Sequence, residues 1–135
     1  ELIVLDRTRR VLLDTAHNPD GAAALARYLS QWYIERPPLI FAAMNDKDVT
    51  GMLRNLLPVV GPVIVTGLGD TRAMDPKTIE TKVVTLEPKR EVIKVNNPTE
   101  ALKKAFLYGS MVCVAGSFFL VGTIREQLQR RAILQ

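Results

Sequence analysis

The sequence contains little cysteine, histidine or aromatic residue. One cysteine and one histidine occur among its 135 residues, and aromatic residues make up 6%. The lone Cys113 cannot form an internal disulfide, and within the strand-like segment 112–115 we expect it to pack as a small apolar side chain. One histidine and one cysteine cannot supply the clustered ligands of a structural zinc site. We therefore predict no metal site made by this chain alone.

Long hydrophobic runs and dense basic stripes are also missing. No apolar run approaches the roughly 18 residues that a membrane-spanning helix needs, and the first residues lack the pattern of a signal peptide. The net charge is +4, but the basic residues are spread along the chain, unlike those of most nucleic-acid-binding sequences. We expect a cytoplasmic protein that binds neither nucleic acid nor membranes. The basic residues are then solvated, or in a weaker alternative their positive field attracts anionic ligands such as nucleotide phosphates.

Common nucleotide and hydrolase motifs are absent as well. No glycine is followed by lysine, so the chain lacks a G-x-x-x-x-G-K-[ST] phosphate loop. Gly67-Leu68-Gly69 follows a strand-like segment, but Arg72 stands where a dinucleotide-binding pattern needs its third glycine, and we interpret it as a turn. No recognisable catalytic triad is present. We expect that this chain alone does not hydrolyse ATP, and an NAD-dependent dehydrogenase is a weak alternative.

Strand-like and helix-like segments alternate along the chain. Repeated β–α units of this length predict one α/β domain over residues 1–135, with a Rossmann-like, mostly parallel sheet covered by helices on both faces. Residues 2–5 and 83–86 are expected to add edge strands or a hairpin. In the first helix we expect one inner face formed by Ala22, Leu25, Leu29 and Trp32. The predicted central strands are residues 11–13, 39–43, 63–66, 92–95 and 112–115, and the predicted helices are residues 19–33 and 48–57, one from residue 97, and one after residue 117.

The chemistry is concentrated where the first central strand ends. Three apolar residues run into Asp14 and the only histidine, His17, and a helix start follows. Asn18 is a good N-cap, and Pro19 suits the first helical turn because that position needs no backbone donor. Asp14 and His17 therefore fall at the carboxyl end of a strand, the edge at which open α/β sheets bind ligands. A plain strand-to-helix turn would explain Asn18 and Pro19 equally well.

Four motifs, in order, resemble those of one enzyme family. Residues 14–21, DTAHNPDG, resemble the D-G-A-H-N-P-x-G signature that opens the C-terminal domain of folylpolyglutamate synthases and dihydrofolate synthases, in the Mur ligase superfamily. Residues 45–48 resemble a K-D-K-D loop, residues 71–73 a P-R-A segment, and residues 112–122 a closing V-x-V-x-G-S-L-Y-L-V-G. Thr15 replaces the usual glycine and Asn45 the usual lysine.

The resemblance implies that this chain is the C-terminal glutamate-ligase domain of a longer enzyme. In that family an upstream P-loop domain holds ATP and magnesium, the γ-carboxylate of a folate is phosphorylated, and the amine of incoming L-glutamate attacks the acyl phosphate. The implied partners are therefore the chain's own upstream ATP-binding domain, a folate or its polyglutamate, and L-glutamate. We expect a monomer whose isolated C-terminal domain is inactive, with magnesium held mainly by the upstream domains.

The resemblance also implies roles for particular residues. Asp14 and His17, the candidate catalytic residues, would contact ATP, with Asp14 accepting hydrogen bonds from ribose hydroxyls and His17 donating to phosphate oxygens. In a purely structural alternative, Asp14 holds His17 as a capping partner. Lys47 and Asp48 are further candidates for ATP, although Asp48 is also a natural N-cap and Lys47 a natural solvated residue.

The remaining candidates concern glutamate. Arg72 matches an arginine with which related ligases bind the incoming amino acid, and a guanidinium can bind a carboxylate through two parallel hydrogen bonds. Ser117 either caps the last helix or contacts glutamate. The sequence does not separate a polyglutamate-only ligase from a bifunctional one that also makes dihydrofolate. An autonomous Rossmann-like nucleotide-binding or regulatory module without ligase activity is the alternative function.

Overall fold

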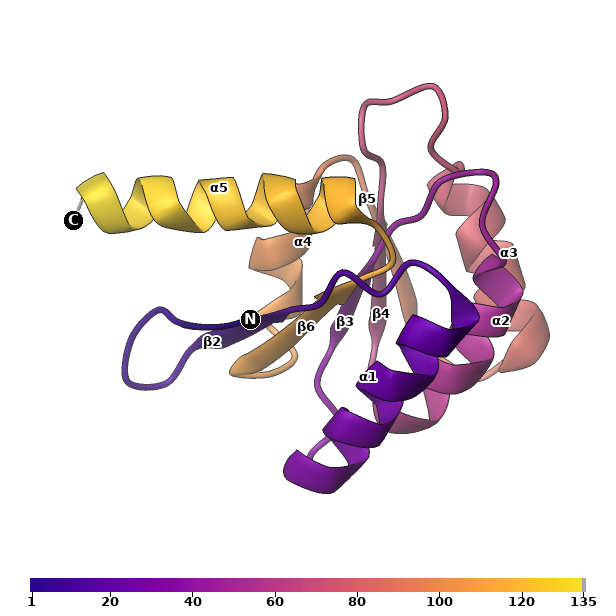
Figure 1. The fold of residues 1–135 in the computed structure, drawn as a ribbon, viewed down its shortest axis with the longest axis horizontal. Coiled ribbons are helices and arrows are strands. Elements are labelled where there is room, and N and C mark those ends of the chain that lie inside the picture. The colour runs from indigo at the N-terminus through magenta and orange to yellow at the C-terminus, as the bar shows by residue number, and fades with distance from the viewer. Residues whose placement is uncertain (135) are drawn as a thin grey trace.

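The computed structural model describes the backbone of residues 1–134 and the side chains of residues 1–131. Six strands form one sheet in the order β1-β2-β6-β3-β4-β5 (Figure 1). The edge strand β1 runs antiparallel to β2, and every other neighbouring pair is parallel. The bounds are β1 (Leu2–Val4), β2 (Arg10–Leu13), β3 (Leu39–Phe41), β4 (Val63–Thr66), β5 (Val92–Val95) and β6 (Met111–Ala115).

Helices cover both faces of the sheet, which confirms the predicted α/β class. One face carries the first three helices and a short 3-10 helix, and the other face carries the last two helices (Figure 1). The bounds are α1 (Pro19–Trp32), α2 (Val49–Leu56), η1 (Leu57–Val59) and α3 (Pro76–Leu86) on the first face, then α4 (Pro98–Ala105) and α5 (Phe118–Leu134) on the second.

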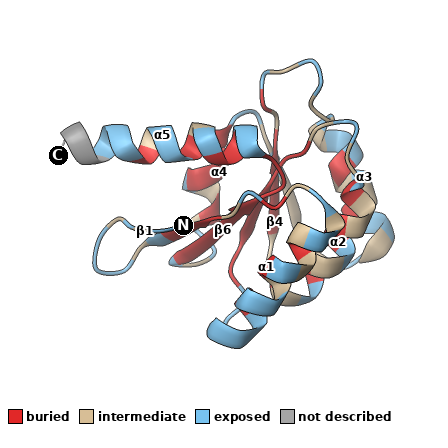
Figure 2. Cartoon of the chain, in the orientation of Figure 1, coloured by how far each residue is buried: buried red, intermediate tan, exposed pale blue. Residues whose placement is uncertain are grey.

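The four central strands β2, β6, β3 and β4 are mostly buried because both of their faces are covered. Side chains alternate between the two hydrophobic clusters, so Leu12 and Phe41 pack beneath α1 and α2 while Leu13 and Ile40 pack beneath α4 and α5. The sheet forms the buried centre in Figure 2. Cys113 is fully buried in β6, and burial raises the pKa of its thiol. It is the small apolar core residue that the sequence predicts.

The prediction of strand structure at residues 83–86 is wrong, because these residues form the last turn of α3. Asp75 caps this helix by accepting a hydrogen bond from the Lys77 N–H at 2.8 Å, and Pro76 occupies the first turn. The helical spacing of buried Ile79 and Val83 outweighs the β-branched composition of the segment.

The predicted inner face of α1 is correct except at its end. Ala22, Leu25 and Leu29 are buried, but Trp32 is 65% exposed. The physical reason is length, since α1 has 14 residues and extends about 21 Å, whereas the four-residue β2 beneath it extends about 13 Å. The last turn of the helix therefore extends beyond the sheet.

The strand order creates a crevice at one edge of the sheet. β6 lies between β2 and β3, but its helix α5 lies on the face opposite α1 and α2. The loops that follow these three parallel strands therefore diverge to opposite faces at the carboxyl edge. Such a switch point is where open α/β sheets bind ligands.

Candidate functional site

Three adjoining pockets follow the carboxyl edge of the sheet. The central pocket has a volume of about 460 Å³ and is lined by His17, Lys47 and Ser117 among others. A pocket of about 410 Å³ shares His17 and contains Asp14. A third, of about 580 Å³, shares Lys47 and contains Arg72. We call these five residues and the three pockets they line the carboxyl-edge site.

Asp14 lies directly after β2 and is half-buried. Its Oδ1 accepts a hydrogen bond from the Ala16 N–H at 2.8 Å, which turns the chain toward α1. Its Oδ2 has no hydrogen-bond partner among the described residues. No hydrogen bond joins Asp14 to His17 there either, so the structural alternative in which Asp14 holds His17 is wrong. Asp14 retains an oxygen that can accept from a ligand.

His17 is held by its backbone neighbour and by an aromatic ring. Its Nδ1 lies 3.0 Å from the carbonyl oxygen of Thr15, and its ring contacts Phe118 with centroids 4.6 Å apart and planes at 42°. Because a carbonyl oxygen only accepts hydrogen bonds, this contact assigns the proton to Nδ1. Nε2 is then the nitrogen left for a ligand. It accepts a hydrogen bond when the ring is neutral and donates one to a phosphate when the ring is protonated.

The loop after β3 carries two candidate residues, Lys47 and Asp48, which make different contacts. Asp48 caps α2, with Oδ1 accepting from the Gly51 N–H at 2.9 Å, and it lines none of the three pockets. Lys47 is half-buried and lines two of them, with its Nζ 3.9 Å from Asp46 Oδ2. The geometry therefore brings Lys47 to the site and gives Asp48 a helix-capping contact.

Arg72 lies in the long loop between β4 and α3, which projects above the sheet in Figure 1. Backbone bonds fasten this loop to its neighbour, because the Asn45 N–H donates to Arg72 O at 2.8 Å and the Met74 N–H to Ala43 O at 2.8 Å. The exposed Arg72 side chain donates through Nε and Nη2 to the two oxygens of Asp70, at 3.1 and 2.9 Å. This contact, together with the Arg72 backbone N–H, which donates to Asp70 Oδ1 at 2.8 Å, lowers the pKa of Asp70 to about 2.

Asp70 therefore occupies one side of the Arg72 guanidinium but leaves the other side open. A guanidinium carries five N–H donors in a planar fork. Asp70 uses the edge formed by Nε and Nη2, and the remaining donors on Nη1 and Nη2 have no partner among the described residues. A second carboxylate can bind end-on across these two nitrogens.

Ser117 both caps α5 and lines the central pocket. Its Oγ accepts a hydrogen bond from the Phe119 N–H at 3.0 Å, and the residue is only 4% exposed. The hydroxyl hydrogen has no acceptor among the described residues, so it is available to a ligand. The cap and the ligand contact are thus compatible, because one uses the hydroxyl as acceptor and the other uses it as donor.

Gly116 allows this loop to lie close to both neighbouring strands. Its φ is +114°, and a Cβ there would collide with the carbonyl oxygen of Ala42. Its N–H donates to Ala16 O at 2.9 Å. A side chain at this position would push the loops after β2, β3 and β6 apart.

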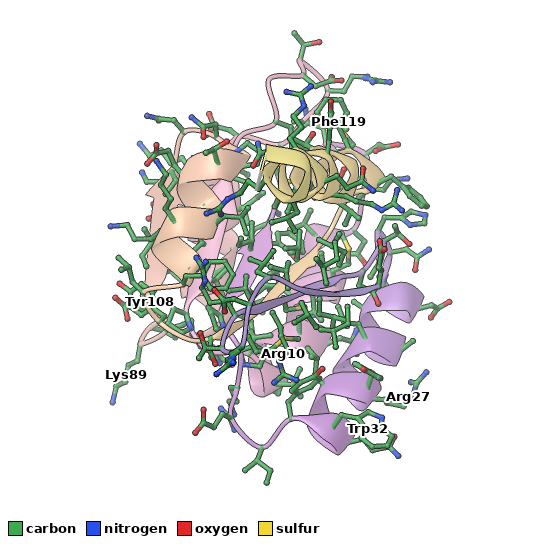
Figure 3. All side chains as sticks on the ribbon, turned by 90° about the vertical axis from the view of Figure 1, so that its left-hand side faces the viewer. Arg10, Arg27, Trp32, Lys89, Tyr108 and Phe119 are labelled. Carbon is green, nitrogen blue, oxygen red and sulfur yellow. The ribbon has the colours of Figure 1, made fainter. Side chains whose placement is uncertain are left out.

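Sequence reasoning missed two aromatic residues of the central pocket. Phe118 and Phe119 are 60% and 45% exposed and line that pocket at the start of α5. In Figure 3, Phe119 lies in the upper part of the molecule, and Trp32 and Lys89 lie in its lower part. One pattern could have identified them, since both lie in the first turn of a helix whose buried stripe begins only at Leu120.

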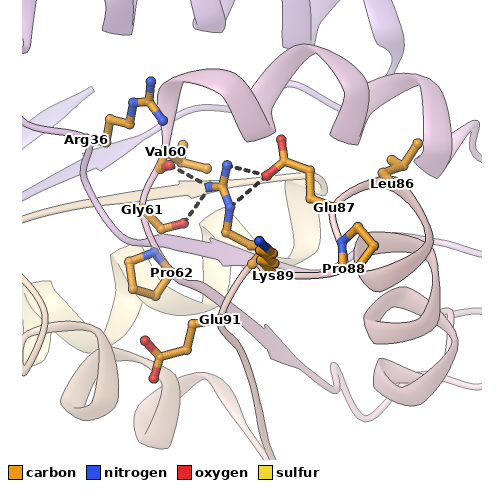
Figure 4. Close-up of a pocket in the computed structure, with 10 residues that line it drawn as sticks. Arg36, Val60, Gly61, Pro62, Leu86, Glu87, Pro88, Lys89 and Glu91 are labelled. Atoms are coloured by element: carbon orange, nitrogen blue, oxygen red, sulfur yellow. Dashed lines mark hydrogen bonds and ion pairs between the residues drawn. The ribbon is translucent and has the colours of Figure 1, made fainter.

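Another pocket, of about 740 Å³, lies at the opposite edge of the sheet (Figure 4). Arg90 crosses it and is 13% exposed. Its Nη1 donates to Val60 O and Gly61 O at 2.6 and 2.9 Å, and its Nη2 donates to Leu57 O at 2.6 Å. Nε and Nη2 also donate to Glu87 at 3.0 and 2.6 Å. All five N–H groups of this guanidinium are therefore bonded within the protein.

Within the part of the chain that the structure describes, no three His, Cys, Asp or Glu side chains gather in a way that could hold a metal ion. None of the described helices combines the length and apolar character needed to span a membrane.

The fold and the site define a class. The chain is an α/β domain in which polar side chains from separate strand-to-helix loops meet at the carboxyl edge of a mostly parallel sheet, as in ligand-binding domains of this architecture. The family model described as "Mur ligase, glutamate ligase domain" matches residues 1–118. The chain belongs to this family.

Relatives of known name support the same family. The chain is 41% identical over 70 residues to the dihydrofolate synthase/folylpolyglutamate synthase of Mycobacterium tuberculosis, a match that covers 51% of this chain and 14% of that protein. It is 31% identical over 130 residues to a probable dihydrofolate synthetase of Schizosaccharomyces pombe, covering 88% of this chain and 31% of that protein. The chain thus spans less than a third of the length of either relative.

Solved structures agree with the fold. The folylpolyglutamate synthase of M. tuberculosis, in complex with ADP, superimposes with a TM-score of 0.83 at 30% identity, over 95% of this chain and 31% of that one. The folylpolyglutamate synthase of Thermotoga maritima gives a TM-score of 0.83 at 29% identity, over 96% of this chain and 30% of that one.

Proposed function

We propose that this chain is the glutamate-ligase domain of an ATP-dependent enzyme that joins L-glutamate to a folate through an acyl phosphate. We also propose that it acts in the cytoplasm, in a monomeric enzyme joined to its own ATP-binding domain. The observation that carries the proposal is the carboxyl-edge site, where His17, Lys47 and Ser117 line one pocket in a domain of the glutamate-ligase family. The M. tuberculosis relative was solved with ADP, which supports a nucleotide as one ligand.

The residues present fit the nucleotide. The free Oδ2 of Asp14 can accept from ribose hydroxyls, while Lys47 and protonated His17 can bind phosphate oxygens. The described residues supply no cluster of ligands for magnesium. The metal, which would neutralise phosphate charge in the reaction, therefore falls to the upstream domain in this proposal. Asp48 contributes only indirectly, by fixing the loop that carries Lys47.

The residues at the other end of the site fit an amino acid. The open edge of the Arg72 guanidinium can bind a carboxylate of glutamate, and the Ser117 hydroxyl can donate to the same substrate. Arg72 and Ser117 line neighbouring pockets that share Met44 and Lys47. A glutamate held between them would lie beside the phosphate-binding side chains.

The chain itself contributes orientation and exclusion of water. Amide formation requires an acyl phosphate and an amine to meet in one geometry, and water competes with the amine for the acyl phosphate. The exposed rings of Phe118 and Phe119 and the side chain of Met44 provide an apolar wall beside the polar groups of the central pocket. Closure of the ATP-binding domain onto this wall would expel water from the reacting atoms.

Steady-state kinetics of the complete enzyme, varying each substrate in turn, tests the proposal. We expect Asp14→Ala and His17→Ala to lower turnover or raise the KM for ATP. Arg72→Ala should raise the KM for glutamate about ten- to a hundredfold, because it removes a charge-assisted contact, and Ser117→Ala should do so more mildly. Normal KM values and turnover in all four variants would contradict the assigned site.

The isolated chain supplies the complementary test. It lacks a phosphate loop, so on its own it should neither hydrolyse ATP nor form glutamyl amides. Turnover by the isolated chain would contradict the proposal of a site completed by an upstream domain. Tight binding of ADP by the isolated chain, together with an inactive complete protein, would instead favour the autonomous nucleotide-binding module.

A further inference from the structure

A second groove lies away from the carboxyl-edge site, between α4, α5 and the turn that joins β1 to β2. Its volume is about 650 Å³. In Figure 1 these three segments lie together on the left-hand side of the molecule, which faces the viewer in Figure 3. The α5 residues that line it come after residue 118, where the match to the family model ends. We call it the α4–α5 groove and define it by the apolar Leu102 and Phe106 and the cationic Arg9, Lys103, Arg130 and Arg131.

The groove carries a positive charge that the protein neutralises only in part. No acidic residue lines it. Two carboxylates next to it pair with two of the cations, since Asp6 accepts from Arg9 at 2.8 Å and Glu126 accepts from Arg130 at 2.6 Å. Lys103 and Arg131 have no ion-pair partner among the described residues. Two positive charges are therefore left for a ligand.

The paired arginines also keep donors available. Arg9 uses only its Nε on Asp6, and its guanidinium lies over the Phe106 ring, 5.5 Å from the centroid. A guanidinium stacked on an aromatic face still presents its Nη edge to an anion. Arg130 binds Glu126 through Nη2 alone. Neither pair closes the groove to a further carboxylate.

This combination fits a flexible chain that carries several carboxylates. Spaced cations can each bind one carboxylate, while the floor formed by Leu102 and Phe106 accommodates methylene groups between them. A single-stranded nucleic acid fits less well, because the groove offers one aromatic ring where base stacking uses several. Along α5, Arg131 lies about 20 Å from Phe118 at the site, a distance that several linked residues can span.

We propose that the α4–α5 groove binds the γ-linked glutamyl tail of a folate that has already received glutamate. The inference rests on the proposed ligase function, and it adds a binding region for the growing product that is separate from the reacting atoms. Each added glutamate brings one more carboxylate, so affinity for the groove should rise with tail length until the cations are matched.

A binding measurement on the isolated chain tests the proposal without ATP or turnover. Calorimetry or NMR titration would use a γ-linked pentaglutamate and, for comparison, free glutamate. We expect the pentamer to bind more tightly, and Lys103→Gln/Arg131→Gln to weaken it about two- to thirtyfold, the range for two exposed ion pairs. Arg27→Gln/Lys89→Gln is the matched control, because it removes two exposed positive charges that do not line the groove.

Three outcomes would overturn the proposal. The first is that the pentamer shows no measurable binding, and the second is that the control variant weakens its binding as much as the groove variant does. The third is that a single-stranded oligonucleotide of equal charge binds with the same affinity as the pentamer and loses the same affinity in the groove variant. Kinetics of the complete enzyme separate this inference from the proposed function. Lys103→Gln/Arg131→Gln should raise the KM for a polyglutamylated folate and leave the KM for the monoglutamate unchanged. If the proposed function is wrong, the complete protein without these substitutions will add glutamate to neither folate.

Discussion

The two edges of the sheet contain pockets of opposite chemical character. At the amino edge, every N–H of Arg90 is bonded to a backbone carbonyl or to Glu87. Figure 4 shows the bonds to Val60, Gly61 and Glu87. At the carboxyl edge, three residues each make one hydrogen bond to the backbone and keep a second polar group available to a ligand. These residues are Asp14, His17 and Ser117. The first arrangement holds the loops together, and the second leaves groups for a ligand.

The difference shows that unused hydrogen-bonding capacity separates these pockets better than their volume does. The amino-edge pocket is larger than each of the carboxyl-edge pockets, yet the guanidinium of its half-buried Arg90 has no free donor. The carboxyl-edge pockets are smaller and lie where three loops diverge. If this distinction is correct, substitutions at the amino edge should cost stability, and substitutions at the carboxyl edge should cost ligand binding.

The largest effect is expected at the amino edge. Arg90→Ala leaves three carbonyl oxygens and the Glu87 carboxylate without their donor, so the free energy of unfolding should fall by about 2 to 4 kcal/mol. For a chain of this size, that corresponds to a loss of roughly 6 to 16 °C in Tm. Thermal unfolding followed by circular dichroism measures it.

Two neighbouring variants control this prediction. Lys89→Ala removes an exposed cation beside Arg90 and should change stability by less than about 0.5 kcal/mol. Arg90→Lys keeps the charge but not the planar fork, so it should recover only part of the loss. An Arg90→Ala variant as stable as the unsubstituted chain would contradict the proposed difference between the two edges.

The carboxyl edge could be predicted from the sequence because its determinants are local. Asn18 accepts from the Gly21 N–H at 2.8 Å as an N-cap should, and Asp14 and His17 follow directly from the strand that precedes them. Strand, loop and helix lie within about 20 residues, so local rules suffice. The assignment of ligands to these side chains came from the resemblance and stays a prediction.

The amino edge could not be predicted, because the contacts of Arg90 are long-range. Its carbonyl partners lie 29 to 33 residues earlier in the chain and belong to the first residue of η1 and to the loop after it. Similarly, nothing local places β6 between β2 and β3. The β-branched composition of residues 83–86 predicts a strand, but the packing of the helix that contains them makes these residues the last turn of α3.

The next largest loss of stability is expected at Ser117, which both caps α5 and lines the central pocket. Ser117→Ala removes the acceptor for the Phe119 N–H, so we expect a loss of about 1 kcal/mol, typical of an N-cap. Denaturant unfolding measures it. Ser30→Ala is a matched control, because the Ser30 hydroxyl is exposed and donates only to a carbonyl of its own helix. A loss of 3 kcal/mol or more would make Ser117 a mainly structural residue.

The contact between Phe118 and His17 should contribute almost nothing to the free energy of unfolding. Phe118 is exposed, so Phe118→Leu should change the free energy of unfolding by less than about 0.5 kcal/mol. It should nevertheless shift the NMR signals of the only imidazole in the chain, because His17 contacts that ring. Phe119→Leu is the control, since no ring contact joins Phe119 to His17 among the described residues. Equal shifts in both variants would contradict the specific contact.

The smallest expected effect concerns Asp70 and tests whether Arg72 is held in place. The pKa of Asp70 is lowered from its ordinary 3.8 to about 2, first by the Arg72 side chain and then by the Arg72 backbone N–H. Because the folded pKa lies below the unfolded one, the contribution of this contact to stability is present above about pH 4 and is lost as the pH falls through about 2. The Arg72 side chain in this pair is exposed to solvent, so this contribution is small.

Carboxyl NMR shifts followed from pH 6 downward, while the amide spectrum stays native, measure this titration. In Arg72→Ala the backbone N–H remains but the guanidinium is gone, so the pKa of Asp70 should rise toward its ordinary value and protonation should begin at higher pH. The pKa of Asp6, which Thr8 and Arg9 hold well below the usual range in a distant turn, should not move. An unchanged Asp70 titration in Arg72→Ala would mean that the side-chain contact is not formed in solution. Arg72 would then approach its proposed glutamate ligand as an unrestrained side chain rather than one already oriented by Asp70.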